Sequence, residues 1–427
     1  RMKNNFQIIT IAVFIVGAIF GLLVFSGAIP IGGDDETQGQ GSVVIWGTLR
    51  GSTVNPLLEE LNNANQTFIT TYVEKSPESF DRELLEALAS GAGPDMYFLP
   101  DNLVYQYGNK VLPVPYTNFS LANFQNSFVS ASEVFLTASG ILAFPIFVDP
   151  MVMYYDRNIL DTNNIVYPPK TWDELVSLVP TLTVKDNTNK INKNAVALGH
   201  SSNVTNYKDI LSMLFMQSGS RVVKAGEGRY VSDLDTNLNA SVLDFYTGFA
   251  DPQQIAYSWN KSFQNSKDYF STGNLAFYFG YASELSSLVN KNPNQNILVA
   301  EVPQLQNAAF KSTMARVTGI SISSFSKNQN TAFIVLNQLT SGNFAAKLSQ
   351  ALGVAPARRD LLNLKPTDSY FPFFYNSSLF ARSWLDPSPN DTDVIFSNMI
   401  NGVLSNNLKA RDAVSAASGR LTLLLNR

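Results

Sequence analysis

Between residues 43 and 99, short apolar runs alternate with a helix-like pattern. An apolar run from Val43 to Trp46 stops at Gly47, and a second run covers Asp95 to Leu99. Between them, Phe80 to Ser90 places phenylalanine and leucine at the spacing of one helical face, and Gly91 follows as a stop signal. A strand, a helix and a strand in this order predict a β-α-β unit with a parallel sheet.

The longest apolar pattern lies between Gly140 and Leu175. Its apolar positions continue across Asp149 and Pro150 and run on to Tyr155, so one carboxylate interrupts a segment with the pattern of a buried strand. A buried charge needs a partner, because its removal from water costs free energy. We therefore expect a ligand to serve as the partner of Asp149.

The same segment ends in a signal for a helix start. The Thr171 hydroxyl is expected to accept a hydrogen bond from the backbone N–H of Glu174, whose carboxylate reaches back to the Thr171 N–H. Trp172, between them, is expected to pack in the core and not to contact a ligand.

Other periodic segments follow along the chain. A strand from Arg316 to Ser323 contains Gly319 in its middle, which predicts a bend or the close approach of another backbone. The remaining expected elements are strands at Ala195–Leu198 and Leu275–Phe279 and helices at Ile210–Gln217, Thr331–Thr340 and Phe344–Leu352.

The N-terminal segment is apolar over the length of a membrane span. Residues 4–33 carry no charge, and as a helix the run from Ile8 to Phe25 is about 27 Å long, close to the hydrocarbon thickness. Basic residues precede it and acidic residues follow, which predicts a cytoplasmic N-terminus and an extracytoplasmic remainder. We expect a single-pass signal anchor at residues 6–28 and a flexible linker at 29–41, with a cleaved signal peptide ending near Ala28 as the alternative.

Composition narrows the possible functions. The net charge of the 427 residues is only -4, and no cluster of lysine and arginine occurs, so nucleic acid is not an expected partner. The chain has no cysteine and one histidine, His200, which argues against zinc sites, iron–sulfur clusters, thiol nucleophiles and disulfides. We expect no cofactor and no metal.

Candidate ligand contacts follow the first two apolar runs. In parallel sheets, ligands bind beyond the carboxyl ends of the strands. Trp46, Thr48 and Asp101 occupy such positions, although Trp46 is equally compatible with an ordinary place in the core.

The order of these parts resembles the extracellular solute-binding proteins of ABC importers, specifically the large family that includes maltose-binding protein. The most specific match is the segment from Gly140 to Leu175, with its acidic residue, its Tyr-Tyr strand and its Pro-Pro-Lys-Thr-Trp-Asp-Glu-Leu ending. Secondary matches begin at Phe270, Thr318 and Gly353. The resemblance covers most of the chain after about residue 42.

The resemblance implies an α/β fold of the two-lobed periplasmic-binding-protein type II class, with the ligand enclosed between the lobes as in a Venus flytrap. The chain would cross between the lobes near Asp149, near Thr318 and near Ala355. One lobe would take residues 42–148 and 319–354, and the other residues 150–317 and 357–427.

The resemblance also assigns ligand-binding positions. Trp46 and Thr48 match the first ligand loop, Asp101 matches the second, and Asp149 is the acidic residue at the first crossing. Tyr281 lies one or two positions from where relatives place a tryptophan that stacks on a sugar ring. Further candidates for the cleft are His200, Asn203, Trp259 and Arg316.

The chemistry of these residue types suits a carbohydrate. Carboxylates accept charge-assisted hydrogen bonds from hydroxyls, and an aromatic ring covers the C–H face of a sugar. We expect a monomeric binding protein without catalytic residues that captures a sugar or oligosaccharide by hinge closure and delivers it to ABC permease subunits. Two alternatives stay open: an extracytoplasmic glycoside hydrolase that uses Asp101 and Asp149, and the ectodomain of a ligand sensor.

Overall fold

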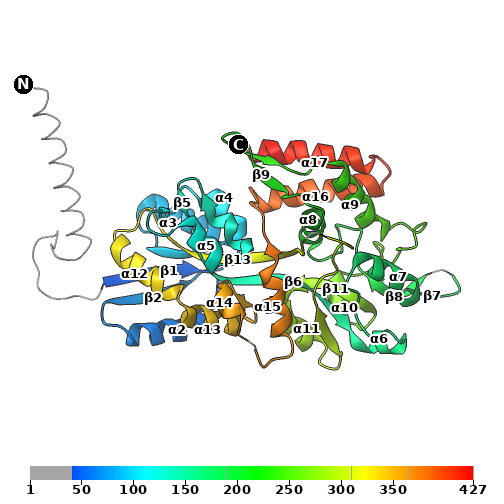
Figure 1. The fold of residues 1–427 in the computed structure, drawn as a ribbon, viewed down its shortest axis with the longest axis horizontal. Helices are drawn as coiled ribbons and strands as arrows, with labels where there is room; N and C mark the ends of the chain where they lie inside the picture. Colours follow the sequence, from blue (N-terminus) through cyan, green and yellow to red (C-terminus); the bar gives the residue numbers. More distant parts are fainter. Residues whose placement is uncertain (1–40, 189, 309, 365, 427) are drawn as a thin grey trace, which may run out of the picture. The chain divides into compact units, whose positions relative to one another are not determined.

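The computed structural model describes residues 41–426 except 189, 309 and 365 (Figure 1). The predicted anchor at residues 6–28, and the predicted linker up to residue 40, lie outside the described residues. In the described part of the chain, no helix combines the length and the apolar character that a membrane crossing requires.

The first strands form the parallel unit that the sequence predicts. Strand β1 (Gly41–Gly47) runs parallel to β3 (Met96–Pro100), and helix α3 (Phe80–Ser90) has the predicted bounds. The sequence interpretation missed helix α2 (Gly51–Asn63) and strand β2 (Phe68–Glu74), which pairs with the other side of β1. The β-α-β prediction is therefore confirmed for its outer members and incomplete between them.

Two long antiparallel strands occupy the middle of the main sheet. Strand β13 (Thr313–Ile322) lies between β3 and β6 (Phe144–Asp156), and β6 continues beside β11 (Leu275–Tyr281). All thirteen residues of β6 are buried, as the apolar pattern around Asp149 predicted. Strand β12 (Ile297–Ala300) also pairs with β6, and β8 (Ile191–Val196) pairs with β11.

The buried residues separate into two lobes, each with its own core. The first lobe packs around the β1–β3 region, and the second packs around β11 and the C-terminal helices. Along β6, Val148 belongs to the first core and Met151 to the second, so Asp149 and Pro150 lie at the junction. The chain therefore passes from one lobe to the other inside a single strand (Figure 1).

The other two connections lie beside this one. Along β13, Ala315 packs in the first core and Met314 in the second. The third connection runs through α15 (Phe371–Leu379) and β15 (Ala381–Arg382), since Ala381 packs in the first core and Trp384 in the second. The chain thus leaves the first core later than near Ala355, where the crossing was expected.

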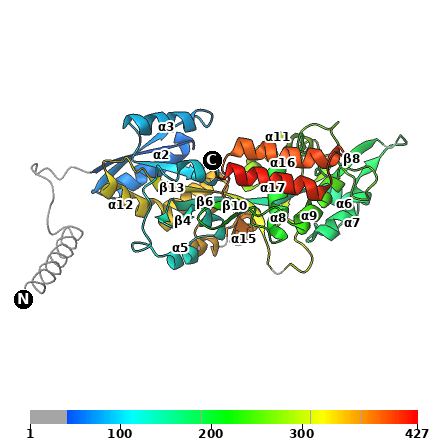
Figure 2. The same cartoon turned by 90° about the horizontal axis from the view of Figure 1, so that it is seen from above.

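One hydrogen bond joins the lobes away from these connections. The Tyr105 hydroxyl, on α4 (Val104–Tyr107) of the first lobe, donates to the Leu425 carbonyl at 2.6 Å. Leu425 caps helix α17 (Ala410–Leu424), which lies beside α16 (Pro389–Leu404), as Figure 2 shows. The first lobe and the end of the C-terminal helix are therefore in contact.

The start of helix α7 (Trp172–Leu182) agrees with half of the predicted capping arrangement. The Thr171 hydroxyl accepts from the Glu174 N–H at 3.2 Å, as expected. The Glu174 carboxylate, however, accepts from the Lys170 N–H at 2.6 Å, one residue earlier than predicted. Trp172 is buried and donates through its indole N–H to Gln217, so it is a packing residue.

Gly319 fulfils the prediction of a close backbone approach. A Cβ atom at this position would lie 2.8 Å from the Cβ of Ala143 and 3.0 Å from the carbonyl oxygen of Phe144. The register between β13 and β6 also shifts between Thr318 and Gly319. The absence of a side chain therefore lets the two crossing strands meet.

The remaining helices lie mostly on the outside of the sheet. They are α5 (Leu121–Ser127), α6 (Arg157–Thr162), α8 (Tyr207–Gln217), α9 (Asn237–Gly248), α10 (Ser266–Phe270), α11 (Leu285–Lys291), α12 (Gln329–Leu339), α13 (Gly342–Leu352) and α14 (Arg359–Leu362). Asn206 directly precedes α8, and its left-handed backbone (φ +59°) turns the chain into that helix. Short 3-10 turns are η1 (Asp101–Leu103), η2 (Ser130–Phe135) and η3 (Ala282–Glu284), and minor strands are β4 (Leu136–Thr137), β5 (Gly140–Ile141), β7 (Val184–Lys185), β9 (Val223–Ala225), β10 (Tyr230–Ser232) and β14 (Ala355–Pro356).

Candidate functional site

A cavity of about 830 Å³ lies where the two lobes meet. Its wall combines loops of the first lobe, the crossing strands β6 and β13, and the first turns of α8 and α16 from the second lobe. The residues that line it are Thr48, Leu49, Pro100, Asp101, Asn102, Phe147, Asp149, Asn206, Tyr207, Lys208, Asp209, Ser283, Met314, Arg316, Thr318, Ser383, Trp384, Asp386, Pro389 and Asp393. The cavity is therefore formed by the crossing strands together with both lobes.

Asp149 sits on the cavity wall at the midpoint of β6. Its carboxylate accepts two hydrogen bonds from Ser283, one from the backbone N–H at 3.0 Å and one from the hydroxyl at 2.6 Å. Burial raises the pKa of Asp149 to about 6, and the bonds from Ser283 and the nearby Arg316 oppose that rise. The protein itself therefore supplies partners for this carboxylate, although the sequence suggested that a ligand would.

Arg316 faces Asp149 from the neighbouring strand, because the two residues are paired in the β6–β13 register. Its guanidinium lies over the Tyr281 ring, with the central carbon 3.9 Å from the ring centroid. Its Nη2 donates to Asp209 Oδ2 at 3.1 Å, and the Tyr281 hydroxyl donates to the same oxygen at 2.8 Å. Tyr281 and Asp209 thus hold Arg316 in one orientation against the cavity.

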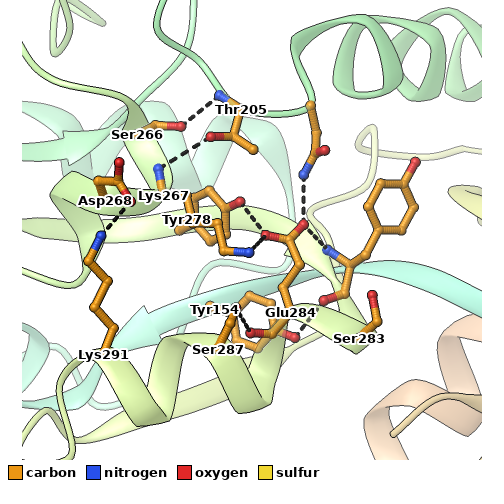
Figure 3. Close-up of polar contacts among 12 residues, drawn as sticks. Tyr154, Thr205, Ser266, Lys267, Asp268, Tyr278, Ser283, Glu284, Ser287 and Lys291 are labelled. Atoms are coloured by element: carbon orange, nitrogen blue, oxygen red, sulfur yellow. Dashed lines mark hydrogen bonds and ion pairs between the residues drawn. The ribbon is translucent and has the colours of Figure 1, made fainter. Parts of the chain in front are cut away.

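A buried carboxylate behind this group fixes the backbone. Glu284 accepts from the Tyr278 hydroxyl at 2.7 Å and from the Tyr281 N–H at 3.0 Å, and it forms an ion pair with Lys267 at 3.0 Å (Figure 3). The Asn206 side chain donates to it as well, at 2.9 Å. Burial alone would raise the pKa of Glu284, but these hydrogen bonds and Lys267 together hold it below its usual value.

Asp101 lies on the opposite wall, at the end of β3. Its carboxylate accepts from the hydroxyl of Ser383, which follows the third connection, and from the Asn102 N–H at 3.0 Å. Burial raises the pKa of Asp101 to about 6, against the lowering effect of Ser383 and of Arg316. The first lobe and the third connection therefore meet at this carboxylate.

A nearly buried ion pair and a tryptophan complete the wall. Lys208 on α8 lies 2.9 Å from Asp386, and the exposed fractions of their side chains are 15% and 8%. Lys208 also donates to Thr392 at 3.1 Å and sits 5.9 Å from the centre of the Trp384 ring. Trp384 stacks on Phe396 with its other neighbours in the second core, so its ring is fixed in place.

The structure brings four of the nine predicted site residues together. Thr48, Asp101, Asp149 and Arg316 all line the cavity, although they come from four separate segments of the chain.

The other five predicted residues lie elsewhere. Tyr281 is fully buried beneath Arg316, so no face of its ring is free to stack on a sugar. Trp46 is half-buried outside the cavity wall, where the Lys75 ammonium covers its ring at 3.8 Å. Trp259 is fully buried and donates to Asn203, whose amide donates to two backbone carbonyls.

His200 is also buried away from the cavity wall. Its Nδ1 has no hydrogen-bond partner among the described residues, and burial lowers its pKa to about 4. Its imidazole is therefore neutral at pH 7, and its backbone carbonyl accepts from the Tyr246 hydroxyl at 3.0 Å.

Several wall residues had no clear signal in the sequence. Lys208, Asp209, Trp384 and Asp386 are charged or aromatic residues in segments without a recognised motif. Trp384 and Asp386 lie in the short segment before helix α16, and only this position outside the helical pattern could have drawn attention to them. In the described part of the chain, no group of three or more histidine, aspartate or glutamate side chains is arranged to hold a metal ion.

The chain matches a known protein family. The family described as bacterial extracellular solute-binding protein matches residues 57–371, which is well over half of the chain. No curated protein sequence matches the chain at a significant level.

Solved structures with the same fold cover nearly the whole described chain. A binding protein for cyclic α-maltosyl-1,6-maltose from Arthrobacter globiformis has a TM-score of 0.77 at 14% identity, over 91% of this chain and 99% of its own. The sugar-binding protein MalE from Xanthomonas citri has a TM-score of 0.76 at 16% identity, over 90% and 97%. A cyclo/maltodextrin-binding protein complexed with maltotetraose has a TM-score of 0.74 at 15% identity, over 91% and 98%.

Proposed function

The chain belongs to the bacterial extracellular solute-binding proteins, and from this premise we propose that it captures a sugar or oligosaccharide in the cavity between its lobes. Members of this family bind substrates and do not transform them, so the chain is a binding protein and not an enzyme. The family also indicates that the binding domain is extracytoplasmic.

The composition of the cavity wall is the observation that carries the proposal. Serine and threonine hydroxyls, carboxylates and one fixed tryptophan meet at the junction of the lobes. A saccharide offers hydroxyls that pair with the polar groups, and C–H faces that an aromatic ring covers. Trp384 is our candidate for the aromatic role that the sequence interpretation gave to Tyr281: it lines the cavity and is 6% exposed, whereas Tyr281 is fully buried beneath Arg316.

Hinge closure fits the way in which the lobes are joined. The three connections pass side by side along β6, β13 and β15, and the cavity has walls from both lobes. A ligand that contacts both walls binds the closed form better than the open form and shifts the population toward it. We propose that the closed form then docks on the permease subunits of an ABC importer.

Attachment to the membrane belongs to the same proposal. A segment at residues 6–28 would hold the protein at the cell membrane with its binding domain outside, as a monomer on a flexible tether. Cell fractionation of the full-length protein, followed by alkaline extraction, tests this step: an anchored protein stays with the membrane pellet.

Ligand capture is tested by thermal denaturation of residues 41–427 in the presence of a panel of neutral mono- and oligosaccharides. A ligand present at 100 times its dissociation constant adds about 2.7 kcal/mol to the free energy of unfolding and raises the melting temperature. Peptides and polyamines serve as controls. The proposal fails if a peptide or a polyamine stabilises the protein and no saccharide does.

The recovered sugar distinguishes binding from hydrolysis. After a long incubation, chromatography is expected to return the oligosaccharide unchanged, whereas a glycoside hydrolase would release new reducing ends. Co-purification with permease subunits, and not with a kinase, separates an importer component from a sensor ectodomain.

A further inference from the structure

The charges on the cavity wall carry information about the charge of the ligand. Carboxylates outnumber cations among the described residues that line it. The carboxylates are those of Asp101, Asp149, Asp209, Asp386 and Asp393, and the cations are those of Lys208 and Arg316.

Both cations already have a carboxylate partner within the protein. Lys208 Nζ lies 2.9 Å from Asp386 Oδ2, in a pair that is almost completely shielded from water. Arg316 Nη2 lies 3.1 Å from Asp209 Oδ2, and its planar face is occupied by Tyr281. The Arg316 side chain is 54% exposed, but its charge is shared with Asp209, so an anionic ligand would have to compete with a carboxylate for either cation.

Aspartates also lie beside the helix N-termini that face the cavity. The first turns of α8 and α16 face the cavity, and the N-terminus of a helix attracts anions. Asp209 lies in the first turn of α8. At α16, Asp386 accepts from the backbone N–H of Ser388 at 3.1 Å and from the Thr392 hydroxyl at 2.9 Å. Aspartates therefore add negative charge beside both helix N-termini, where a phosphate or carboxylate group would otherwise be attracted.

None of the remaining carboxylates forms an ion pair with a cation of its own among the described residues. Asp101 and Asp149 are only 6% and 7% exposed, and their hydrogen bonds come from Ser383, Asn102 and Ser283. Asp393 is exposed at the start of α16. The wall as a whole therefore carries more negative than positive charge, and this excess would repel an anionic ligand.

We propose that the cavity binds saccharides without negative charge and rejects phosphorylated sugars and uronic acids, an inference that rests on the proposed function. Asp209 and Asp386 act as the selective elements. They pair with Arg316 and Lys208 and lie beside the starts of α8 and α16. Unpaired like charges in an interface cost several kcal/mol, so the discrimination should be large.

The test compares three chemical forms of one oligosaccharide, with maltotriose and cellotriose run in parallel. The first is the neutral sugar, the second carries a carboxylate in place of a primary alcohol at C6, and the third is the methyl ester of that acid. Isothermal titration calorimetry at low ionic strength measures each dissociation constant. The acid is expected to bind at least about 100-fold more weakly than its ester. The ester controls for the altered group at C6, because it has nearly the same size and no charge.

A pair of variants assigns the effect to the cavity. Asp393→Asn removes one exposed negative charge from the wall, and Asp412→Asn removes an exposed one from the start of α17, outside the wall. The ratio of the acid and ester dissociation constants should fall several-fold in Asp393→Asn and stay unchanged in Asp412→Asn. Added salt should also reduce this ratio in the unaltered protein.

The outcomes separate this inference from the proposed function. If the acid binds as tightly as its ester or more tightly, the cavity does not select against anions, although the protein still binds sugars. If an anionic sugar binds and no neutral sugar does, the inference is likewise overturned. If no saccharide of any charge binds, the proposed function itself fails.

Discussion

At the scale of single residues, variants of two tryptophans distinguish a ligand contact from a packing position. Trp384 lines the cavity, whereas Trp46 lies outside its wall beneath Lys75. We expect Trp384→Leu to weaken binding of a neutral oligosaccharide about tenfold or more, because the ring that would cover the sugar is lost. Trp46→Leu should leave affinity unchanged. Calorimetric titration measures both, and a loss of affinity only in Trp46→Leu would show that Trp46, and not Trp384, contacts the ligand.

Asp149 should make stability depend on pH. Its folded pKa of about 6 lies above the ordinary value of 3.8, so the folded protein holds a proton more tightly than the unfolded chain between these two values. The contribution of Asp149 to the free energy of unfolding therefore falls as the pH rises through this window and is fully lost above it. Asp149→Asn removes the titration, and its stability relative to the unaltered protein should increase between pH 4.5 and 7.

Urea denaturation at several pH values measures this difference. Asp173→Asn, on the exposed start of α7, controls for the change in net charge. An equal pH dependence in the Asp149→Asn variant and in the unaltered protein would contradict the prediction.

Only part of the site could be predicted from the sequence. Asp149 stands out because it interrupts an apolar strand, and Asp101 stands out because it follows one. The burial of Tyr281 could not be predicted, since it depends on Arg316, which is 35 positions away and reaches it only through the pairing of β13 with β6. Trp384 and Lys208 meet across a still longer interval, for which the local pattern holds no information.

At the scale of elements, Gly319 is the position where the crossing strands tolerate least change. Gly319→Ala would place a methyl group 2.8 Å from the Cβ of Ala143, between two strands that cannot separate easily. We expect a loss of about 1 to 3 kcal/mol in the free energy of unfolding, the usual cost of overpacking.

Gly419→Ala is the matched control. Gly419 is exposed within α17 and has no atom within 4 Å of an added Cβ, so alanine should stabilise the helix by about 0.5 to 1 kcal/mol. Chemical denaturation compares the two variants. A neutral effect of Gly319→Ala would show that β6 and β13 can move apart.

The predicted elements succeeded where one face of a helix or a long run is apolar. Helix α3 has the predicted bounds, and α8, α12 and α13 lie within three residues of theirs, because their apolar spacing is regular. Strand β2 was missed, since two of its buried positions are the polar residues Thr70 and Tyr72, an exposed one is the apolar Ile69, and it lies at the edge of the sheet. A half-buried edge strand carries little apolar signal in the sequence.

At the scale of the whole molecule, the bond between Tyr105 and Leu425 links the lobes beside the cavity. Neither residue lines the cavity, so their effect on ligand binding acts through the balance of open and closed forms. We expect Tyr105→Phe to weaken sugar binding by a factor of about 2 to 12, which corresponds to the loss of one ordinary hydrogen bond of about 0.5 to 1.5 kcal/mol.

Tyr116→Phe provides the comparison for this variant. The Tyr116 hydroxyl donates to Thr137 at 2.7 Å within the first lobe, so its loss should lower stability without changing affinity. Calorimetric titration and small-angle scattering measure affinity and the balance of forms. If the Tyr105→Phe variant and the unaltered protein have equal affinities, the bond is present to the same extent in the open and closed forms.

The position of β13 has a consequence for building fragments and chimeras of this protein. β3 and β6 belong to the first 156 residues of the sequence, yet they are joined only through β13, which is synthesised much later. A gene truncated before residue 313 would encode a first lobe with two unpaired strand edges, which are sites of aggregation. Because the chain passes between the lobes at three connections, exchange of a lobe between relatives requires three junctions in the gene, and a split version of the protein must carry residues 313–322 in the same fragment as the strands that they join.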